Sequence, residues 1–174
     1  MLLMLIAALG QTMAMPAPRP NCQVPAARAE SMLAAGYDDF DQGMGPSSWR
    51  SALNEGCYTG AADVIGRYLE AHKTQLDAEQ TRTLYFHAGQ ALALGGEESK
   101  SIPFFLLARD ATATPEWNAY VDSMIAFGRQ DRAALAAARE AYAKATKPGS
   151  PRLKVIDAML SCFGKSYREA MSCG

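Results

Sequence analysis

Apolar residues recur three and four positions apart from Trp49 to the end of the chain, and apolar residues at alternating positions are almost absent. This spacing places apolar side chains on one face of an α-helix, whereas a half-buried β-strand requires a period of two. The successive helical faces are Ala61, Val64, Ile65, Tyr68 and Leu69; Leu84, Tyr85, Ala88, Ala91 and Leu92; Ile102, Phe105 and Leu106; Trp117, Tyr120, Val121, Met124 and Phe127; Leu135, Ala138 and Tyr142; and Leu153, Ile156, Met159, Leu160 and Phe163. The pattern predicts an all-α fold.

Capping residues mark where several of these helices begin. The pairs Thr114–Pro115 and Ser150–Pro151 each place a hydroxyl oxygen ahead of a proline, which is favoured in the first turn of a helix. Ser166 and Glu169 have the spacing of a capping box, in which two side chains satisfy two free amides. The sequence therefore predicts helices that begin at both prolines and a short terminal helix after Ser166.

Bulky aromatic residues open successive helix pairs at a nearly constant interval. Trp49, Tyr85 and Tyr120 are separated by 36 and 35 residues, and a further 35 residues lead to Val155. A single helix pair cannot bury its apolar face alone, so units of this kind stack on their neighbours. The interval predicts a chain of helix-turn-helix repeats.

The unit that begins at Tyr85 resembles a tetratricopeptide repeat. The residues that carry the resemblance are Tyr85, Ala88, Gly89 and Leu92 on the first helix, Ser101, Phe105 and Ala108 on the second, and Pro115 near the end of the unit. The resemblance extends over residues 46–172, although the units at Trp49 and Tyr120 match only loosely and the last unit is truncated. It implies antiparallel helix pairs stacked as a short right-handed solenoid.

The first 14 residues are expected to be a secretory signal peptide. The apolar run of residues 1–9 is followed by Thr12 and Ala14, small residues at the −3 and −1 positions of a cleavage site. The run is shorter than the ~20 residues that span a bilayer. No lysine or arginine precedes it, which leaves open an upstream start or an ordinary buried first helix.

The rest of the chain divides into two parts. Residues 15–45 form a segment rich in proline and glycine that can hold one short helix, and residues 46–174 form the tetratricopeptide-like repeat domain. Asp38, Asp39 and Asp41 make an acidic cluster in the first part, but they lack the alternating ligands and terminal glutamate of an EF-hand loop. We expect a solvated loop there.

Four cysteines, an even number, are expected to form two disulfides, because export places them in an oxidising compartment. Of the three possible pairings we favour Cys22 with Cys57 and Cys162 with Cys173, since each closes a loop at one end of the chain. A metal site is the competing interpretation. The cysteines include no Cys-x-x-Cys pair and the chain has only two histidines, so we expect no metal.

The sequence offers little for catalysis. It contains no glycine-rich phosphate loop, nucleophile elbow, paired histidines on a helix or dinucleotide fingerprint, so we expect no catalytic residues and no cofactor. His72 ends a predicted helix, where an imidazole interacts with terminal carbonyls. The net charge of −1 provides no general basic field for nucleic acid or for an anionic membrane surface.

The resemblance to tetratricopeptide repeats implies a concave surface, built from the first helix of each unit, that holds a peptide or a segment of a partner protein. The candidate groove residues are Arg82, His87, Gln90, Asn118 and Asp122. The expected function is a non-enzymatic, periplasmic or secreted protein-binding module, without stable membrane insertion after signal cleavage. It is either an adaptor or an inhibitor of the immunity type for an envelope partner. The alternative is a small envelope enzyme, or a cell-wall hydrolase accessory, that uses carboxylates.

Overall fold

The computed structural model describes residues 15–173, so the predicted signal peptide lies outside the described residues. Within this range the chain is helical and contains no β-strand, which confirms the all-α prediction. The elements are α1 (Ala26–Leu33), the π-helix η1 (Asp38–Gln42), α2 (Trp49–Asn54), α3 (Tyr58–Ala71), α4 (Ala78–Leu94), α5 (Glu98–Ala108), α6 (Pro115–Gly128), α7 (Arg132–Ala145), α8 (Pro151–Ser161) and α9 (Tyr167–Ala170). None of the helices described is long and apolar enough to cross a membrane.

The positions of the predicted helix starts are confirmed, but Ser150 does not cap α8: its hydroxyl lies 2.9 Å from the hydroxyl of Tyr142 instead. α6 and α8 begin at the two prolines, and the Thr114 hydroxyl accepts a hydrogen bond of 3.1 Å from the amide of Trp117. Ser166 and Glu169 form the capping box that begins α9. These signals are local, because the groups that satisfy each other lie within one turn of helix.

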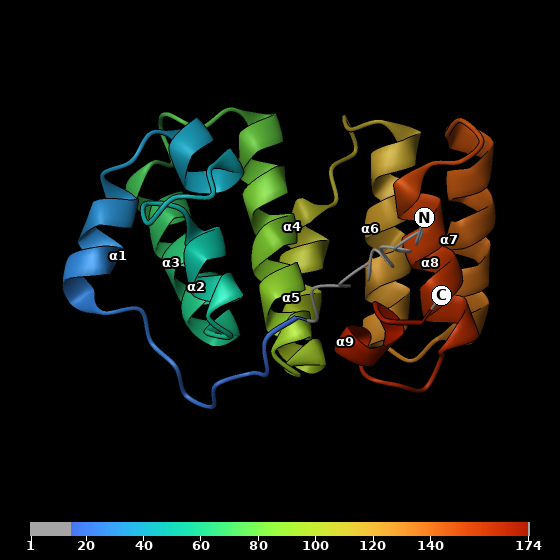
Figure 1. Ribbon diagram of the computed structural model, residues 1–174. Coiled ribbons are helices and arrows are strands. Elements are labelled where there is room, and N and C mark those ends of the chain that lie inside the picture. The colour runs from blue at the N-terminus through green and yellow to red at the C-terminus, as the bar shows by residue number, and fades with distance from the viewer. Residues whose placement is uncertain (1–14, 174) are drawn as a thin grey trace, which may run out of the picture.

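The helices from α2 to α9 pack in chain order, each against the next, and α4 also packs against α9 (Figure 1). α4 lies between two buried cores. Leu84 and Ala88 belong to the core formed with α1, α2 and α3, whereas Phe86 and Ala93 belong to the core formed with the later helices. Because α4 is covered on both sides, it is the element on which the two halves of the chain meet.

Residues 15–25 contain no helix or strand and pass the start of α3 (Figure 1); we call them the N-terminal strap. The amide of Arg19 donates to the carbonyl of Gly56 at 2.9 Å. A side chain at Gly56 would clash with the strap, because its Cβ would lie 2.3 Å from the carbonyl oxygen of Ala17. Gly56 also has a φ of 77°, which favours glycine. The strap is therefore closely fitted to the turn before α3.

Both expected disulfides are present, with the favoured pairing. Cys22 of the strap is bonded to Cys57 at the start of α3, and Cys162 at the end of α8 is bonded to Cys173 after α9. Two disulfides fit an oxidising compartment. Each one joins an end of the chain to the helix beside it.

The two ends of the described chain also touch each other. The guanidinium of Arg168 in α9 donates to the carbonyl of Met15 at 2.5 Å and to the hydroxyl of Tyr58 at 3.3 Å. The Tyr58 hydroxyl in turn donates to the carbonyl of Pro16 at 2.8 Å. α9 is fixed to the middle of the chain as well, since the amide of Tyr167 donates to Glu98 at 3.1 Å.

The acidic segment before α2 is not the solvated loop that we expected. Residues 38–42 form η1, and Phe40 and Asp41 are fully buried. The Phe40 ring stacks on that of Tyr68 in α3, with 3.8 Å between the ring centroids. The expectation fails because one apolar side chain in the cluster anchors the segment to the core and carries Asp41 inward, while Asp38 and Asp39 stay exposed.

Candidate functional site

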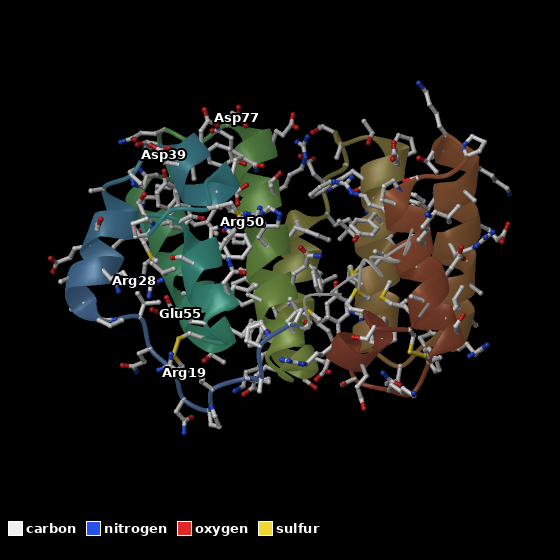
Figure 2. The ribbon with its side chains drawn as sticks, viewed as in Figure 1. Arg19, Arg28, Asp39, Arg50, Glu55 and Asp77 are labelled. Atoms are coloured by element: carbon white, nitrogen blue, oxygen red, sulfur yellow. A yellow bond between two sulfur atoms is a disulfide. The ribbon has the colours of Figure 1, made fainter. Side chains whose placement is uncertain are left out.

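A cavity of about 530 Å³ opens between α2, α4, α6 and α8, and we call it the inter-helix groove. Its volume lies within the usual range of ligand pockets. The side chains that dominate its lining are Arg50, Arg82, His87, Trp117, Tyr120 and Arg152. Figure 2 places Arg50 between α2 and α4. Each of the four helices therefore contributes at least one of these side chains.

A buried carboxylate supports one wall of the groove. Asp41 is completely shielded from solvent, and its Oδ1 accepts hydrogen bonds from Trp49 Nε1 at 3.0 Å and from His87 Nδ1 at 2.7 Å. Gln42 donates to Oδ2, and Arg50 Nε donates to the Asp41 carbonyl at 2.7 Å. A buried carboxylate is costly unless it is paired and hydrogen-bonded, and these donors meet that requirement.

These contacts decide the ionisation of Asp41. Burial alone would raise the pKa of its carboxyl, but hydrogen bonds from His87 and Trp49 and the nearby Arg50 charge outweigh it and hold this pKa below the ordinary value of 3.8. Asp41 is therefore an anion at neutral pH. It receives Nδ1–H of His87 and so fixes the orientation of the imidazole, and Nε2 has no hydrogen-bond partner among residues 15–173.

The interior of the groove is aromatic. Phe86 lies with its ring centroid 5.3 Å from that of Trp117 and 5.3 Å from that of Tyr120. The Trp117 indole is fixed from the other side, because its Nε1 donates to the carbonyl of Ala108 at 2.9 Å. The rings are thus held by packing and by a hydrogen bond, and they provide a rigid apolar surface.

Arginines lie over these rings. The guanidinium carbon of Arg82 in α4 is 5.9 Å from the Trp117 centroid, and that of Arg152 in α8 is 5.8 Å from the same ring and 5.1 Å from Tyr120. Arg50 is 4.4 Å from the ring of Trp49. Cation–π contacts of this kind orient a guanidinium without neutralising its charge.

The groove has fewer carboxylates than cations within reach. Glu79 and Glu116 are the acidic residues in its lining. Oε1 of Glu116 already accepts hydrogen bonds from Tyr142 at 2.9 Å and Thr146 at 3.0 Å. Arg82 lies 3.5 Å from Glu79 and 3.8 Å from Asp110, and Arg152 forms no ion pair within the described range 15–173. The positive charges of the groove are therefore incompletely matched.

Three of the five predicted groove residues meet here. Arg82, His87 and Gln90 lie along one side of α4 and line the groove. Asn118 instead bonds both backbone groups of Asp110, at 2.7 and 3.2 Å, and so shapes the turn between α5 and α6. Asp122 pairs with Arg109 at 2.8 Å on another surface.

The predicted groove residues did not include six other side chains of the site: Asp41, Arg50, Phe86, Trp117, Tyr120 and Arg152. Trp117 was assigned to the core, since its spacing fits the apolar face of α6. Asp41 belongs to the segment expected to be a solvated loop, and no sequence pattern singles out Arg50 or Arg152. The sequence contained one local signal for the contacts of Asp41. Trp49 and Arg50 follow the acidic cluster closely, and each offers it one hydrogen-bond donor.

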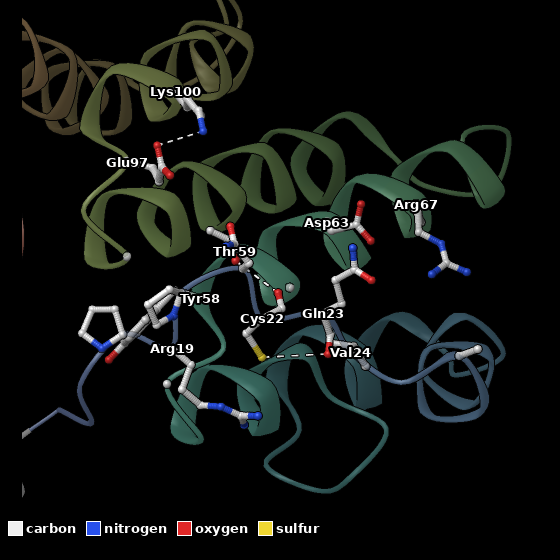
Figure 3. Close-up of a pocket in the computed structure, with 17 residues that line it drawn as sticks. Arg19, Cys22, Gln23, Val24, Tyr58, Thr59, Asp63, Arg67, Glu97 and Lys100 are labelled. Atoms are coloured by element: carbon white, nitrogen blue, oxygen red, sulfur yellow. Dashed lines mark hydrogen bonds and ion pairs between the residues drawn. The ribbon is translucent and has the colours of Figure 1, made fainter.

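A second hollow of about 770 Å³ lies where the strap passes α3 and the start of α5 (Figure 3). Within the described residues, one ion pair lies in its lining, Lys100 with Glu97 at 3.0 Å, and Thr59 donates to the carbonyl of Cys22 at 3.2 Å. Much of its lining is strap. This hollow lies between the strap and the helices beside it, and none of the predicted groove residues line it.

The groups considered for catalysis do not converge. Glu97 pairs with Lys100, Glu98 receives the amide of Tyr167, and Nε2 of His72 lies 2.8 Å from the carbonyl of Leu33 at the end of α1. Within residues 15–173, His87 has no hydrogen bond to a hydroxyl or thiol, and no three metal-ligating side chains gather at one point.

Comparison of the chain with protein-family models, with curated proteins and with solved structures yields no match.

Proposed function

We propose that this chain is an exported protein-binding module that holds a segment of its partner in the inter-helix groove. One observation carries the proposal. The groove is lined by α2, α4, α6 and α8, which are the first helices of the units expected from Trp49, Tyr85, Tyr120 and Val155. In a tetratricopeptide-like stack the first helices share the concave face, so a common groove between them supports that arrangement.

The groove has the composition of a recognition surface. Aromatic rings and arginines provide most of the binding energy in protein interfaces, and Phe86, Trp117 and Tyr120 with three arginines combine both. Their helices form the buried core, so the ring positions are set before a partner arrives. A preformed surface loses little conformational entropy on binding.

Export is part of the proposal. It is supported by the signal-like residues 1–14 and by two disulfides, which persist in oxidising compartments. The partner is then a protein of the cell envelope or of the surroundings, and the module is an adaptor or an inhibitor. An envelope enzyme that acts through carboxylates is the weaker alternative, because Glu97 and Glu98 are engaged in contacts away from the groove.

The proposal is tested by filling the groove without changing its charge. Thr83 lines it from α4, and Thr83→Trp would occupy part of its volume. Ala136→Trp is the matched control, because Ala136 is exposed on α7 and lines none of the hollows described. Wild type and both variants are immobilised and exposed to an envelope extract of the source cells, and folding is checked by circular dichroism.

We expect a protein that is retained by wild type and Ala136→Trp and is lost from Thr83→Trp. Retention by all three proteins would place the binding surface elsewhere. Retention by none would contradict the proposed function.

A further inference from the structure

We propose that the segment held in the inter-helix groove is acidic, and that Arg82 and Arg152 receive its side-chain carboxylates beside the Trp117 ring. This inference rests on the proposed function, because it names the chemistry of the groove's occupant.

Neither guanidinium is hydrogen-bonded to a carboxylate within the part of the chain that the structure describes. Arg82 is 3.5 Å from the exposed Glu79 and 3.8 Å from Asp110, and neither contact is a hydrogen bond. Its side chain is only 19% exposed, so water compensates its charge poorly. Arg152 forms no ion pair and no hydrogen bond within the part of the chain that the structure describes. A carboxylate from outside would supply what both groups lack.

Their placement suits a single ligand. Arg82 comes from α4 and Arg152 from α8, yet both lie within 6 Å of the Trp117 ring, which α6 presents between them. Guanidiniums match carboxylates in a planar, bidentate geometry, and the ring limits their motion. The methylene groups of the ligand's acidic side chains can pack on the Trp117 ring while their carboxylates reach the two arginines.

The other charged residues around the groove do not oppose the binding of an acidic segment. Asp41 is buried and already bonded to His87 and Trp49, so it is not presented to a ligand. One oxygen of Glu116 is engaged by Tyr142 and Thr146. The unbonded Nε2 of His87 offers an additional polar contact.

A peptide segment with several acidic side chains fits this site better than a nucleic acid or a single C-terminal carboxylate does. Arg50 stands on α2, away from the Arg82 and Arg152 pair, so cations face the ligand from more than one wall. Several side-chain carboxylates can meet them, whereas a single chain terminus carries one. A nucleic acid needs a continuous basic surface, and the net charge of −1 with Glu79 and Glu116 at the groove opposes it.

The test uses tryptophan fluorescence of the exported protein, because Trp117 lies in the groove. The probe is an acetylated and amidated pentapeptide of alternating glutamate and alanine. Its analogues carry glutamine or lysine in place of glutamate, and a fourth peptide has the glutamine sequence with a free C-terminal carboxylate. A short DNA duplex is titrated in parallel.

We expect the glutamate peptide to bind more tightly than its analogues, with an affinity that falls as salt is added. Arg152→Gln should weaken this binding on the order of fivefold. The control Lys154→Gln, an exposed cation two positions along α8, should leave it nearly unchanged.

Three results overturn the inference: equal binding of the glutamine peptide, preference for the free C-terminus or for DNA, and equal effects of the two α8 variants. The proposed function fails separately, through the Thr83→Trp experiment, because that substitution blocks the groove whatever charge its occupant carries. If Thr83→Trp loses a partner that Arg152→Gln retains, the proposed binding function stands and the proposal of an acidic segment is contradicted.

Discussion

Asp41 and His87 are 46 positions apart in the chain, yet 2.7 Å separates Oδ1 of the first from Nδ1 of the second. The contact connects η1 to α4 and places a buried anion behind the groove wall. It therefore links the stability of the N-terminal half to the shape of the candidate binding surface.

Removing the charge of Asp41 should destabilise the fold. We expect Asp41→Asn to lower the free energy of unfolding at pH 7 by roughly 2 to 4 kcal/mol, because it breaks a buried, charge-assisted network. Asp39→Asn is the matched control two positions away, where the side chain is exposed, and it should change the value by less than about 0.5 kcal/mol. Urea unfolding of the three proteins measures both effects, and equal losses would contradict the assigned network.

The same network predicts a direction for the pH dependence. The folded state holds the pKa of Asp41 below its ordinary value of 3.8, so the stabilisation is present above that pH and is lost as pH falls through the lower folded pKa. We expect the stability difference between wild type and Asp41→Asn to shrink as pH decreases below 3.8. Unfolding curves collected at several acidic pH values test this, and a difference that grows on acidification would contradict it.

The fit of the strap can be tested at Gly56. Alanine there needs a positive φ and places its Cβ against the Ala17 carbonyl, so we expect Gly56→Ala to cost about 1 to 3 kcal/mol and to expose the strap to proteases. Gly36 has neither feature, and Gly36→Ala should be neutral or slightly stabilising. Unfolding and limited proteolysis are the measurements. Faster cleavage of both variants, or of neither, would contradict this account.

The disulfides should contribute unequally. In the loop-entropy model the 35-residue separation of Cys22 and Cys57 gives about 4 kcal/mol, and the 11-residue separation of Cys162 and Cys173 gives about 3 kcal/mol. Replacing each pair by serines and measuring guanidinium unfolding tests the order. Alkylation of the exported, denatured protein without reductant should find no free thiol, and any labelled cysteine would oppose the two-disulfide framework.

Export makes a separate prediction about the N-terminus. If residues 1–14 are removed, the mature chain begins at Met15, whose carbonyl is held by Arg168. Intact-mass analysis of the periplasmic or secreted fraction should find the shortened chain. Full-length protein confined to the cytoplasm would contradict both the signal peptide and the proposed compartment.

Local features of this fold could be predicted from the sequence, whereas its site could be predicted only in part. The start of α6 depends on a cap within one turn, α8 begins at its proline, and the disulfides join segments near the same end of the chain. Arg82, His87 and Gln90 share one side of α4, so helical spacing alone groups them. Arg152 lies near these residues only because α8 packs beside α6. Asp41 contacts His87 only because Phe40 anchors η1 to the core. The hydrophobic periodicity of the sequence specifies neither contact.

The contact between Arg168 and Met15 joins residues 153 positions apart, almost the whole described chain. During synthesis the strap is made before α9, so this contact can form only after residue 168 has been added. A product truncated before α9 would keep its strap through Cys22 and Cys57 but lose the hold of Arg168. The contact thus distinguishes a chain that includes α9 from one that stops before it, and a strap without this hold would be more accessible to proteases.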